Sequence, residues 1–187
     1  MRIISGQFKG KKIKEPKDKN TRPLKDLTKE SIFNIIQHSN NLNLTLKKSK
    51  ILDLFSGVGS FGLEALSRGA NFITFVENYP EVAKILKENI RNLDLDQKCE
   101  IIEKNIIDNF DFIKLDEKYV LIFIDPPFRE KKVKSLLLNV YKSKILKLDG
   151  ILIIHRNSKE RDSFPTEINI LENRIYGKSQ IFFCKFN

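Results

Sequence analysis

A short apolar segment that runs directly into a cluster of glycines constrains the fold of this chain most strongly. Residues 50–62 read Lys-Ile-Leu-Asp-Leu-Phe-Ser-Gly-Val-Gly-Ser-Phe-Gly. The apolar run is typical of a strand buried on both faces, and the residues after it, to about Gly69, read as a short helix. Because glycine permits a tight turn and lets a ligand approach the backbone, this junction predicts a nucleotide-like site or an ordinary strand-to-helix turn.

An acidic residue stands where such a site would hold a ribose. A second predicted strand, Phe72–Val76, is followed directly by Glu77, whose carboxylate can accept hydrogen bonds from both ribose hydroxyls. Dinucleotide enzymes and methyltransferases share this arrangement. The segment that separates the two classes lies downstream, where a later apolar run at 120–124 leads into Asp125-Pro-Pro-Phe128.

The remaining apolar patterns alternate between helix and strand. They predict helices at about 26–38, 78–92 and 130–144, strands at 99–102 and 150–154, and a final antiparallel pair at 168–171 and 181–186. This order predicts an α/β protein with a doubly wound, mostly parallel sheet. In the helix at 26–38 we expect Leu27 on the buried side. After the strand at 150–154 we expect His155 and Arg156 to be surface loop residues.

Positive charge is concentrated near the N-terminus. Residues 1–29 hold ten Lys or Arg against three acidic residues, which leaves only +3 of the net charge of +10 to the rest of the chain. This asymmetry indicates contact with nucleic-acid phosphates, and the alternative is a lysine-rich composition that merely solvates the surface. β-prone pieces around Gly6 and Gly10 predict a hairpin, in which Phe8 either stacks on RNA or packs the hairpin onto the main domain.

Length and composition set the remaining bounds. The 187 residues suffice for one well-packed domain with a small N-terminal appendage. No apolar run approaches the roughly 20 residues of a membrane span, and the N-terminus is basic and polar, so we expect a cytoplasmic protein without membrane contact. The two His and two Cys residues lack ligand-like spacing, so we expect no metal site.

Several motifs occur together from residue 1 to near the C-terminus. They are Met1-Arg-Ile-Ile-Ser-Gly-Gln-Phe-Lys-Gly-Lys-Lys-Ile, Thr21-Arg-Pro-Leu-Lys-Asp, Lys29-Glu-Ser-Ile-Phe-Asn34, Asp53-Leu-Phe-Ser-Gly-Val-Gly, Asp125-Pro-Pro-Phe and Tyr176-Gly-Lys-Ser. With them the chain resembles the bacterial methyltransferase family that uses S-adenosylmethionine to modify a guanine N2 in 16S ribosomal RNA.

The resemblance implies a Rossmann-like methyltransferase fold with a seven-stranded sheet, an antiparallel C-terminal strand, and a small N-terminal hairpin and helix. It divides the chain into an RNA-binding extension, residues 1–40, and an S-adenosylmethionine-dependent methyltransferase domain, residues 41–187. The implied partner is ribosomal RNA or the small ribosomal subunit, and we expect a monomer.

The resemblance also assigns site residues, in three groups. Those implied for catalysis are Asp125, Pro126, Pro127 and Phe128. Those implied for the cofactor are Asp53, Phe55, Gly57, Gly59, Glu77, Asn78, Asn105 and Ile106. Those implied for the substrate are Arg2, Phe8, Lys9, Lys11, Lys12 and Arg22. Asn105 stands where the family usually has an aspartate facing the adenine amino group, and its carbonyl oxygen can still accept from that group.

Three alternatives stay open. Adenine-N6 methyltransferases of DNA and glutamine-N5 methyltransferases of proteins use related loops. A chain of this length has no room for a separate DNA-recognition domain, and the loop begins with Asp125 rather than the asparagine typical of the protein-modifying family. The third alternative is an RNA-binding module for ribosome assembly that has lost catalysis.

Overall fold

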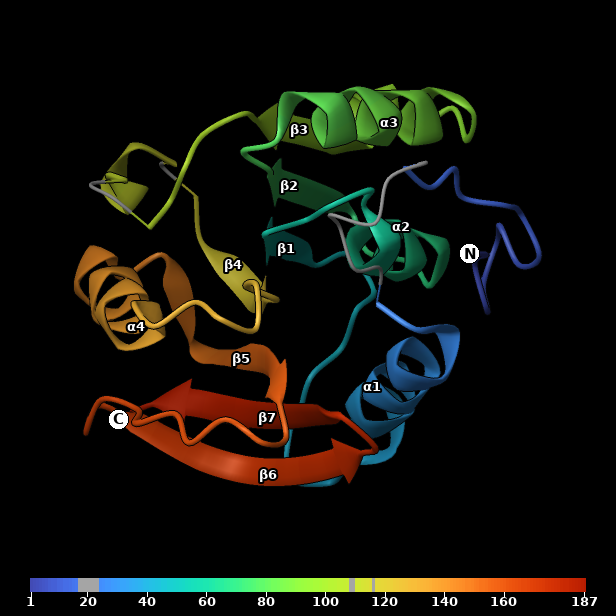
Figure 1. The fold of residues 1–187 in the computed structure, drawn as a ribbon. Coiled ribbons are helices and arrows are strands. Elements are labelled where there is room, and N and C mark those ends of the chain that lie inside the picture. The colour runs from blue at the N-terminus through green and yellow to red at the C-terminus, as the bar shows by residue number, and fades with distance from the viewer. Residues whose placement is uncertain (17–23, 108–109, 116) are drawn as a thin grey trace.

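A seven-stranded sheet forms the centre of the structure, and helices cover both of its faces (Figure 1). The computed structural model describes residues 1–16, 24–107, 110–115 and 117–187. In chain order its elements are α1 (Asp26–His38), β1 (Lys50–Leu54), α2 (Ser60–Ser67), β2 (Phe72–Val76), α3 (Pro80–Arg91), the 3-10 helix η1 (Asp96–Lys98), β3 (Cys99–Ile102), the 3-10 helix η2 (Phe112–Leu115), β4 (Tyr119–Ile124), α4 (Val133–Ser143), β5 (Leu146–Asn157), β6 (Ile168–Tyr176) and β7 (Ser179–Phe186). No helix within these ranges is both long and apolar enough to cross a membrane.

The strand order confirms the predicted fold class. It is β3-β2-β1-β4-β5-β7-β6, with β1 to β5 parallel to one another. β7 lies between β5 and β6 and is antiparallel to both. The direction of winding reverses between β1 and β4, and in open α/β sheets ligands bind at the carboxyl ends of the strands at such a point.

Each face of the sheet has its own apolar core, which explains why the central strands are apolar without alternation. Ile51 and Leu121 point to the face covered by α1, α2 and α3, whereas Leu52 and Ile122 point to the face covered by α4 and η2. Side chains of successive strand residues leave on opposite faces, so a strand covered on both sides is apolar at most of its positions.

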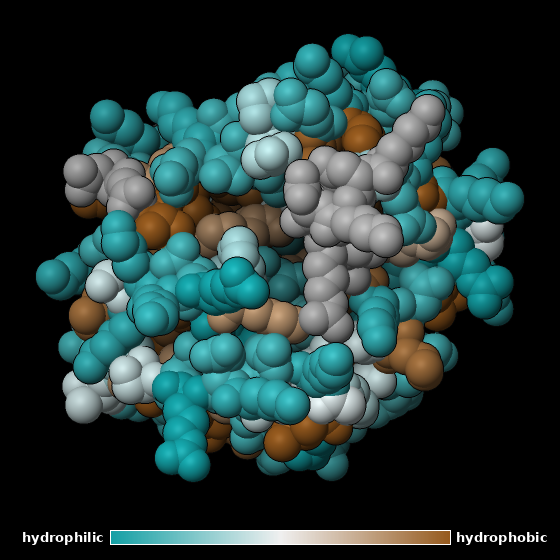
Figure 2. All heavy atoms as spheres, viewed as in Figure 1, coloured by the Kyte–Doolittle hydropathy of each residue, from teal (hydrophilic) through white to brown (hydrophobic). Residues whose placement is uncertain are grey.

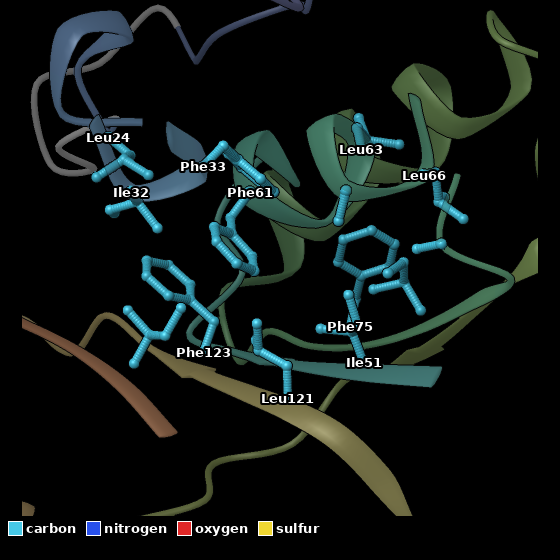
Figure 3. Close-up of a cluster of buried hydrophobic side chains, with 14 of the residues drawn as sticks. Leu24, Ile32, Phe33, Ile51, Phe61, Leu63, Leu66, Phe75, Leu121 and Phe123 are labelled. Atoms are coloured by element: carbon cyan, nitrogen blue, oxygen red, sulfur yellow. The ribbon is translucent and has the colours of Figure 1, made fainter. Parts of the chain in front are cut away.

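A stack of three aromatic rings ties α1 to the elements that carry the site (Figure 3). The ring of Phe61, in α2, lies 4.9 Å from that of Phe33, in α1, and 3.9 Å from that of Phe123, in β4, measured between centroids. The guanidinium of Arg68 lies over the outer ring, 4.7 Å from the centroid of Phe33. The position of α1 is therefore fixed relative to the end of β4.

The N-terminal hairpin is present in a reduced form. A single antiparallel bridge joins Arg2 and Lys12, supported by a backbone hydrogen bond of 3.0 Å from Ile3 N to Lys11 O. Ile3 and Ile13 are buried in the same core as the residues of β1 and β4. The N-terminal segment therefore shares its core with the sheet, and a division of the chain at residue 40 stays a prediction.

The buried face of α1 differs from the prediction at Leu27, whose side chain is 77% exposed. The residues that face inward are Thr28, Lys29, Ile32, Phe33 and Ile36. Lys29 can lie inside because its amine donates to Arg2 O at 2.7 Å and to Ser60 Oγ at 3.2 Å. Burial lowers the pKa of Lys29, and the carboxylates of Glu64 and Asp26 oppose that shift. Lys29, with its amine hydrogen-bonded, therefore occupies a position on the face of α1 that was expected to be apolar.

β5 is longer than predicted, and this corrects the expectation for His155 and Arg156. Both residues lie inside β5, paired with Ile181 and Gln180 of β7, and only 6% and 2% of their surfaces are exposed. The expectation that they are surface loop residues was wrong because β7 supplies backbone partners beyond Ile154.

We expect Phe33→Ala to lower the free energy of unfolding by about 3 to 5 kcal/mol, since it removes a fully buried ring from the stack. Urea denaturation measures this loss. Leu27→Ala, on the exposed side of the same helix, is the matched control and should change stability by no more than about 0.5 kcal/mol. Equal losses in the two variants would contradict the observed orientation of α1.

Candidate functional site

Three carboxylates meet at the carboxyl ends of neighbouring strands. Asp53 lies near the end of β1, Glu77 follows β2, and Asp125 follows β4. All three line one cavity of about 500 Å³, a volume typical of small-molecule sites. Figure 2 shows hydrophilic side chains over most of this face and a group of apolar side chains in a hollow near its middle. The sheet has thus brought together side chains that are far apart in the sequence.

Glu77 is held by backbone donors. Its Oε2 accepts from Gly57 N at 2.7 Å and its Oε1 accepts from Tyr79 N at 2.8 Å. Each carboxylate oxygen has two lone pairs, so both can still accept from a ligand. The orientation of Glu77 is therefore set before any ligand arrives.

Asp53 is the most deeply buried of the three carboxylates. Only 1% of its surface is exposed, and its Oδ2 accepts from Gly62 N, in the first turn of α2, at 3.0 Å. Burial raises the pKa of Asp53 well above its ordinary range, the charges of Asp125 and Glu77 raise it further, and the Gly62 N–H opposes the shift. A cation bound in the cavity would relieve this repulsion among carboxylates.

Asp125 is oriented by a histidine that the sequence did not assign. Its Oδ1 lies 2.8 Å from Nδ1 of His155, near the end of β5, and 19% of its side chain is exposed. The ring of Phe128 meets the imidazole edge to face at 5.5 Å between centroids. The acidic end of the loop and its aromatic end therefore both contact the same residue of the neighbouring strand.

Arg156 holds the backbone of the same loop. Its guanidinium donates to the carbonyl oxygens of Pro127 at 3.2 Å, Phe128 at 3.3 Å and Glu130 at 2.9 Å. Two further bonds, of 2.8 and 3.0 Å, pair it with Asp162. The planar guanidinium offers five donors, and these contacts explain how an arginine can be almost completely buried.

Two of the predicted cofactor glycines have different tasks. A Cβ built on Gly57 would meet no atom within 4 Å, so the backbone there borders open space. A Cβ on Gly59 would lie 2.4 Å from Leu86 Cδ1, and its φ of +85° favours glycine. Gly57 also has a φ that favours glycine, +56°, but borders open space, whereas Gly59 lets the turn pack against α3.

The remaining predicted cofactor residues line two neighbouring cavities. Phe55 and Asn78 border both the large cavity and a smaller one of about 250 Å³. Asn105 and Ile106 line only the smaller one. The side-chain oxygen of Asn105 accepts from Ile107 N at 2.9 Å, which orients the amide toward its own loop.

The residues predicted to bind substrate are not among those that line the cavity, insofar as the structure describes them, although Met1 and Pro16 of the same segment are. Arg2, Lys9, Lys11 and Lys12 are exposed. Phe8 is half-buried and packs against the core, and its backbone N–H donates to Ser67 Oγ at 2.9 Å. Arg22 lies outside the described residues.

Other residues at the cavity were missed by the sequence analysis. Lys25, at the start of α1, and Ser60, at the start of α2, line it together with His155. The sequence held one signal for the histidine. His155 and Arg156 are polar and directly follow the apolar residues of β5, and β5 pairs with β4, the strand that ends before Asp125. No group of three or more His, Cys, Asp or Glu side chains in the described ranges is arranged to hold a metal ion.

The family of the chain follows from comparison with known proteins. Residues 1–185 match the family described as Conserved hypothetical protein 95. The chain belongs to this family. Its resemblance to ribosomal RNA methyltransferases, inferred from the motifs, is confirmed at the family level by the relatives described next.

Curated and solved relatives of this Conserved hypothetical protein 95 member cover nearly all of it. The chain is similar to ribosomal RNA small subunit methyltransferase D of Buchnera aphidicola, with 31% identity over 96% of this chain and 90% of that one. It is 30% identical to YlbH of Bacillus subtilis over 99% and 98% of the two chains. The solved structure of yhhF from Escherichia coli has a TM-score of 0.82 at 22% identity, covering 100% and 97%, and shows the same fold.

We expect Asp53→Asn to change how the stability of this family member depends on pH. A carboxyl group whose pKa is raised by folding stabilises the protein fully below its ordinary pKa, near pH 4, and this contribution is lost as the pH rises toward the folded value. The variant has no titrating carboxyl group at this position and so does not lose this stability. Its side-chain amide oxygen can still accept from Gly62 N.

Urea denaturation of both proteins between pH 4 and pH 8 measures the difference, because all other groups titrate in both. The stability of the wild type should fall relative to that of the variant as the pH rises above about 4. A constant difference across the series would contradict a raised pKa at Asp53.

Proposed function

We propose that this protein transfers a methyl group from S-adenosylmethionine to the exocyclic N2 of a guanine in small-subunit ribosomal RNA. The observation that carries the proposal is that Asp125, at the start of Asp-Pro-Pro-Phe, lines the same cavity as Glu77 and Gly57. A loop suited to an amino group thus borders a site suited to a nucleoside. The curated relative named ribosomal RNA small subunit methyltransferase D supports the same reaction class and the same kind of RNA.

The cavity fits the cofactor by charge and by hydrogen bonding. S-Adenosylmethionine carries a sulfonium and an ammonium group, and the cavity presents the carboxyl groups of Asp53, Glu77 and Asp125. Glu77 keeps lone pairs for the ribose hydroxyls, and Gly57 leaves open space beside it. The smaller cavity, lined by Asn105 and Ile106, is the proposed place of the adenine ring.

When bound, S-adenosylmethionine supplies an electrophilic methyl group, and the chain has to make the target nitrogen nucleophilic. The lone pair of an exocyclic amino group is delocalised into the base. Acceptors placed beside the amino hydrogens favour the tetrahedral geometry in which the lone pair is localised. In this proposal the acceptors are the Asp125 carboxylate and the backbone carbonyl of Pro126.

Asp125 acts by orientation more than by basicity. His155 engages one lone pair of Oδ1, and Oδ2 keeps both of its lone pairs for the amino group. Once the nitrogen has been methylated it loses its extra proton readily, and a strong base is not required. Arg156 supports this step indirectly because it fixes the carbonyl groups of the loop that follows Asp125.

Phe128 is the proposed stacking partner of a base that leaves its helix. Its ring is half-buried and is braced by the edge-to-face contact with His155. Enzymes that modify a base commonly take it out of the stack and hold it against aromatic side chains. Two successive prolines, which lack N–H groups and have restricted φ, keep the loop before the ring rigid.

RNA is proposed to lie along the exposed basic residues of the N-terminal segment, Arg2, Lys9, Lys11 and Lys12. Glu64 anchors this segment by accepting from Ile4 N at 2.7 Å and Ser5 N at 3.0 Å. Contacts of Phe8 or Arg22 with RNA stay predictions, as do the cytoplasmic location and the monomeric state.

Small ribosomal subunits that lack the modification, incubated with the protein and labelled S-adenosylmethionine, test the proposal. Digestion to nucleosides should place the label in N2-methylguanosine. Label in N6-methyladenosine, in a cytidine or in ribosomal protein would contradict the guanine assignment. Absence of any label, with intact cofactor binding, would favour a module for ribosome assembly.

In this assay Asp125→Ala should lower turnover by about 10²-fold or more, because the missing acceptor matters chiefly as the nitrogen changes geometry. Calorimetry should show cofactor affinity close to that of the wild type. Asp149→Ala, an exposed aspartate near the start of β5, is the control and should keep full activity. Full activity of Asp125→Ala would refute the mechanism.

The basic segment can be tested by charge removal, because Ile3 and Ile13 belong to the core and a deletion would remove them. Replacing Lys9, Lys11 and Lys12 with Gln should weaken RNA binding and flatten its salt dependence, by up to about 0.7 in the logarithmic slope for each phosphate that is no longer neutralised. The matched control replaces Lys142, Lys144 and Lys147, which lie around the end of α4 and the start of β5. Equal salt-dependence slopes in the two triple variants would mean that the N-terminal lysines are solvated surface residues without RNA contacts.

A further inference from the structure

His155 is buried at the cavity with one ring nitrogen unpaired. The residue lies near the end of β5 and lines the cavity next to Asp125 and Phe128. Its Nε2 is buried and has no hydrogen-bond partner among the residues that the structure describes. A buried polar atom without a partner is costly unless a ligand supplies one. Because His155 lines the cavity, a ligand bound there is the candidate partner for this nitrogen.

The contact with Asp125 decides what this nitrogen can do. An ionised carboxylate can only accept, so the 2.8 Å contact from Nδ1 to Asp125 Oδ1 places the proton of a neutral imidazole on Nδ1. Nε2 then carries a lone pair and acts as an acceptor. The site therefore presents two acceptors coupled to each other, the Asp125 carboxylate and His155 Nε2.

Two coupled acceptors match the edge of guanine. Guanine carries its N2 amino group next to the N1–H, so two donors stand side by side on its Watson–Crick edge. Adenine carries its amino group next to an N1 lone pair, which would face the lone pair of Nε2. Cytosine likewise has a ring lone pair, at N3, beside its amino group.

We infer that His155 is a specificity-determining residue whose Nε2 accepts a hydrogen bond from the N1–H of the target guanine. The inference rests on the proposed function and adds to it a reason for the choice of base. Asp125 receives the amino group, His155 reads the neighbouring ring atom, and the bond between the two side chains keeps both acceptors in one arrangement.

A single change in the substrate tests this contact. The RNA carries either guanosine or 2-aminopurine ribonucleoside at the position that the wild-type protein methylates, introduced by splinted ligation. 2-Aminopurine keeps the N2 amino group but has a lone pair at N1. The measured quantity is the ratio of kcat/KM for the two RNAs, which also contains any effect of the missing O6.

His155→Asn separates the two contacts of the imidazole. The shorter side-chain amide can still donate to Asp125 but lacks the distal acceptor. The ratio of kcat/KM for the guanosine RNA to that for the 2-aminopurine RNA should be at least about tenfold larger in the wild type than in this variant. Only the wild type has the Nε2 acceptor, so only the wild type loses a hydrogen bond when N1–H is replaced by a lone pair. His155→Gln, whose amide can rotate to donate as well as accept, should also lose most of the preference. His38→Asn, at the exposed end of α1, should keep it.

The outcomes separate this inference from the function on which it rests. Failure of the wild type to methylate the guanosine RNA overturns the proposed function and the inference with it. Methylation of guanosine, with the same ratio in the wild type and both His155 variants, overturns the inference alone. Equal rates of the wild type on the two RNAs do the same, and this comparison needs no variant to fold. Cofactor binding by calorimetry checks the fold of each variant.

Discussion

The site depends on the repulsion among three carboxyl groups placed together at the ends of β1, β2 and β4, of which Asp53 and Glu77 are buried. Carboxylates so close together repel one another, and each is stabilised by donors from a different part of the chain. Asp53 has the Gly62 amide, Glu77 has the amides of Gly57 and Tyr79, and Asp125 has His155. Without these donors the same strand order would leave carboxyl groups without hydrogen-bond partners in a cavity, at a cost in stability.

Local sequence patterns predict the helices and strands of the protein well and its buried polar residues poorly. The bounds of α1, β2 and β3 agree with the patterns, because periodicity and apolar runs report whether a segment faces a core. His155 and Arg156 were expected in a loop, since polarity after an apolar run usually marks the end of a strand. Their burial depends on partners up to 30 residues away in the chain, and no local pattern contains that information.

The same limit explains the face of α1. The pattern predicted Leu27 as an inward residue, yet Leu27 is exposed and Lys29 is fully buried. Its amine satisfies the Arg2 carbonyl and Ser60, and lies 3.8 Å from Glu64 Oε2. From sequence alone a lysine is predicted to be exposed unless its hydrogen-bond acceptors are known. The acceptors of Lys29 lie in the N-terminal segment and in α2. The site residues on the glycine turn and at Glu77 and Asp125 could be predicted because they follow strands directly.

Arg156 grips the loop after Asp125 through main-chain oxygens alone. Every amino acid has a carbonyl oxygen, so the grip does not depend on which side chains the loop carries at positions 128–130. Evolution can exchange those side chains without moving the loop. The position of the loop is thus independent of the side chains that it presents to a substrate. Related proteins can therefore change their targets and keep the same backbone arrangement.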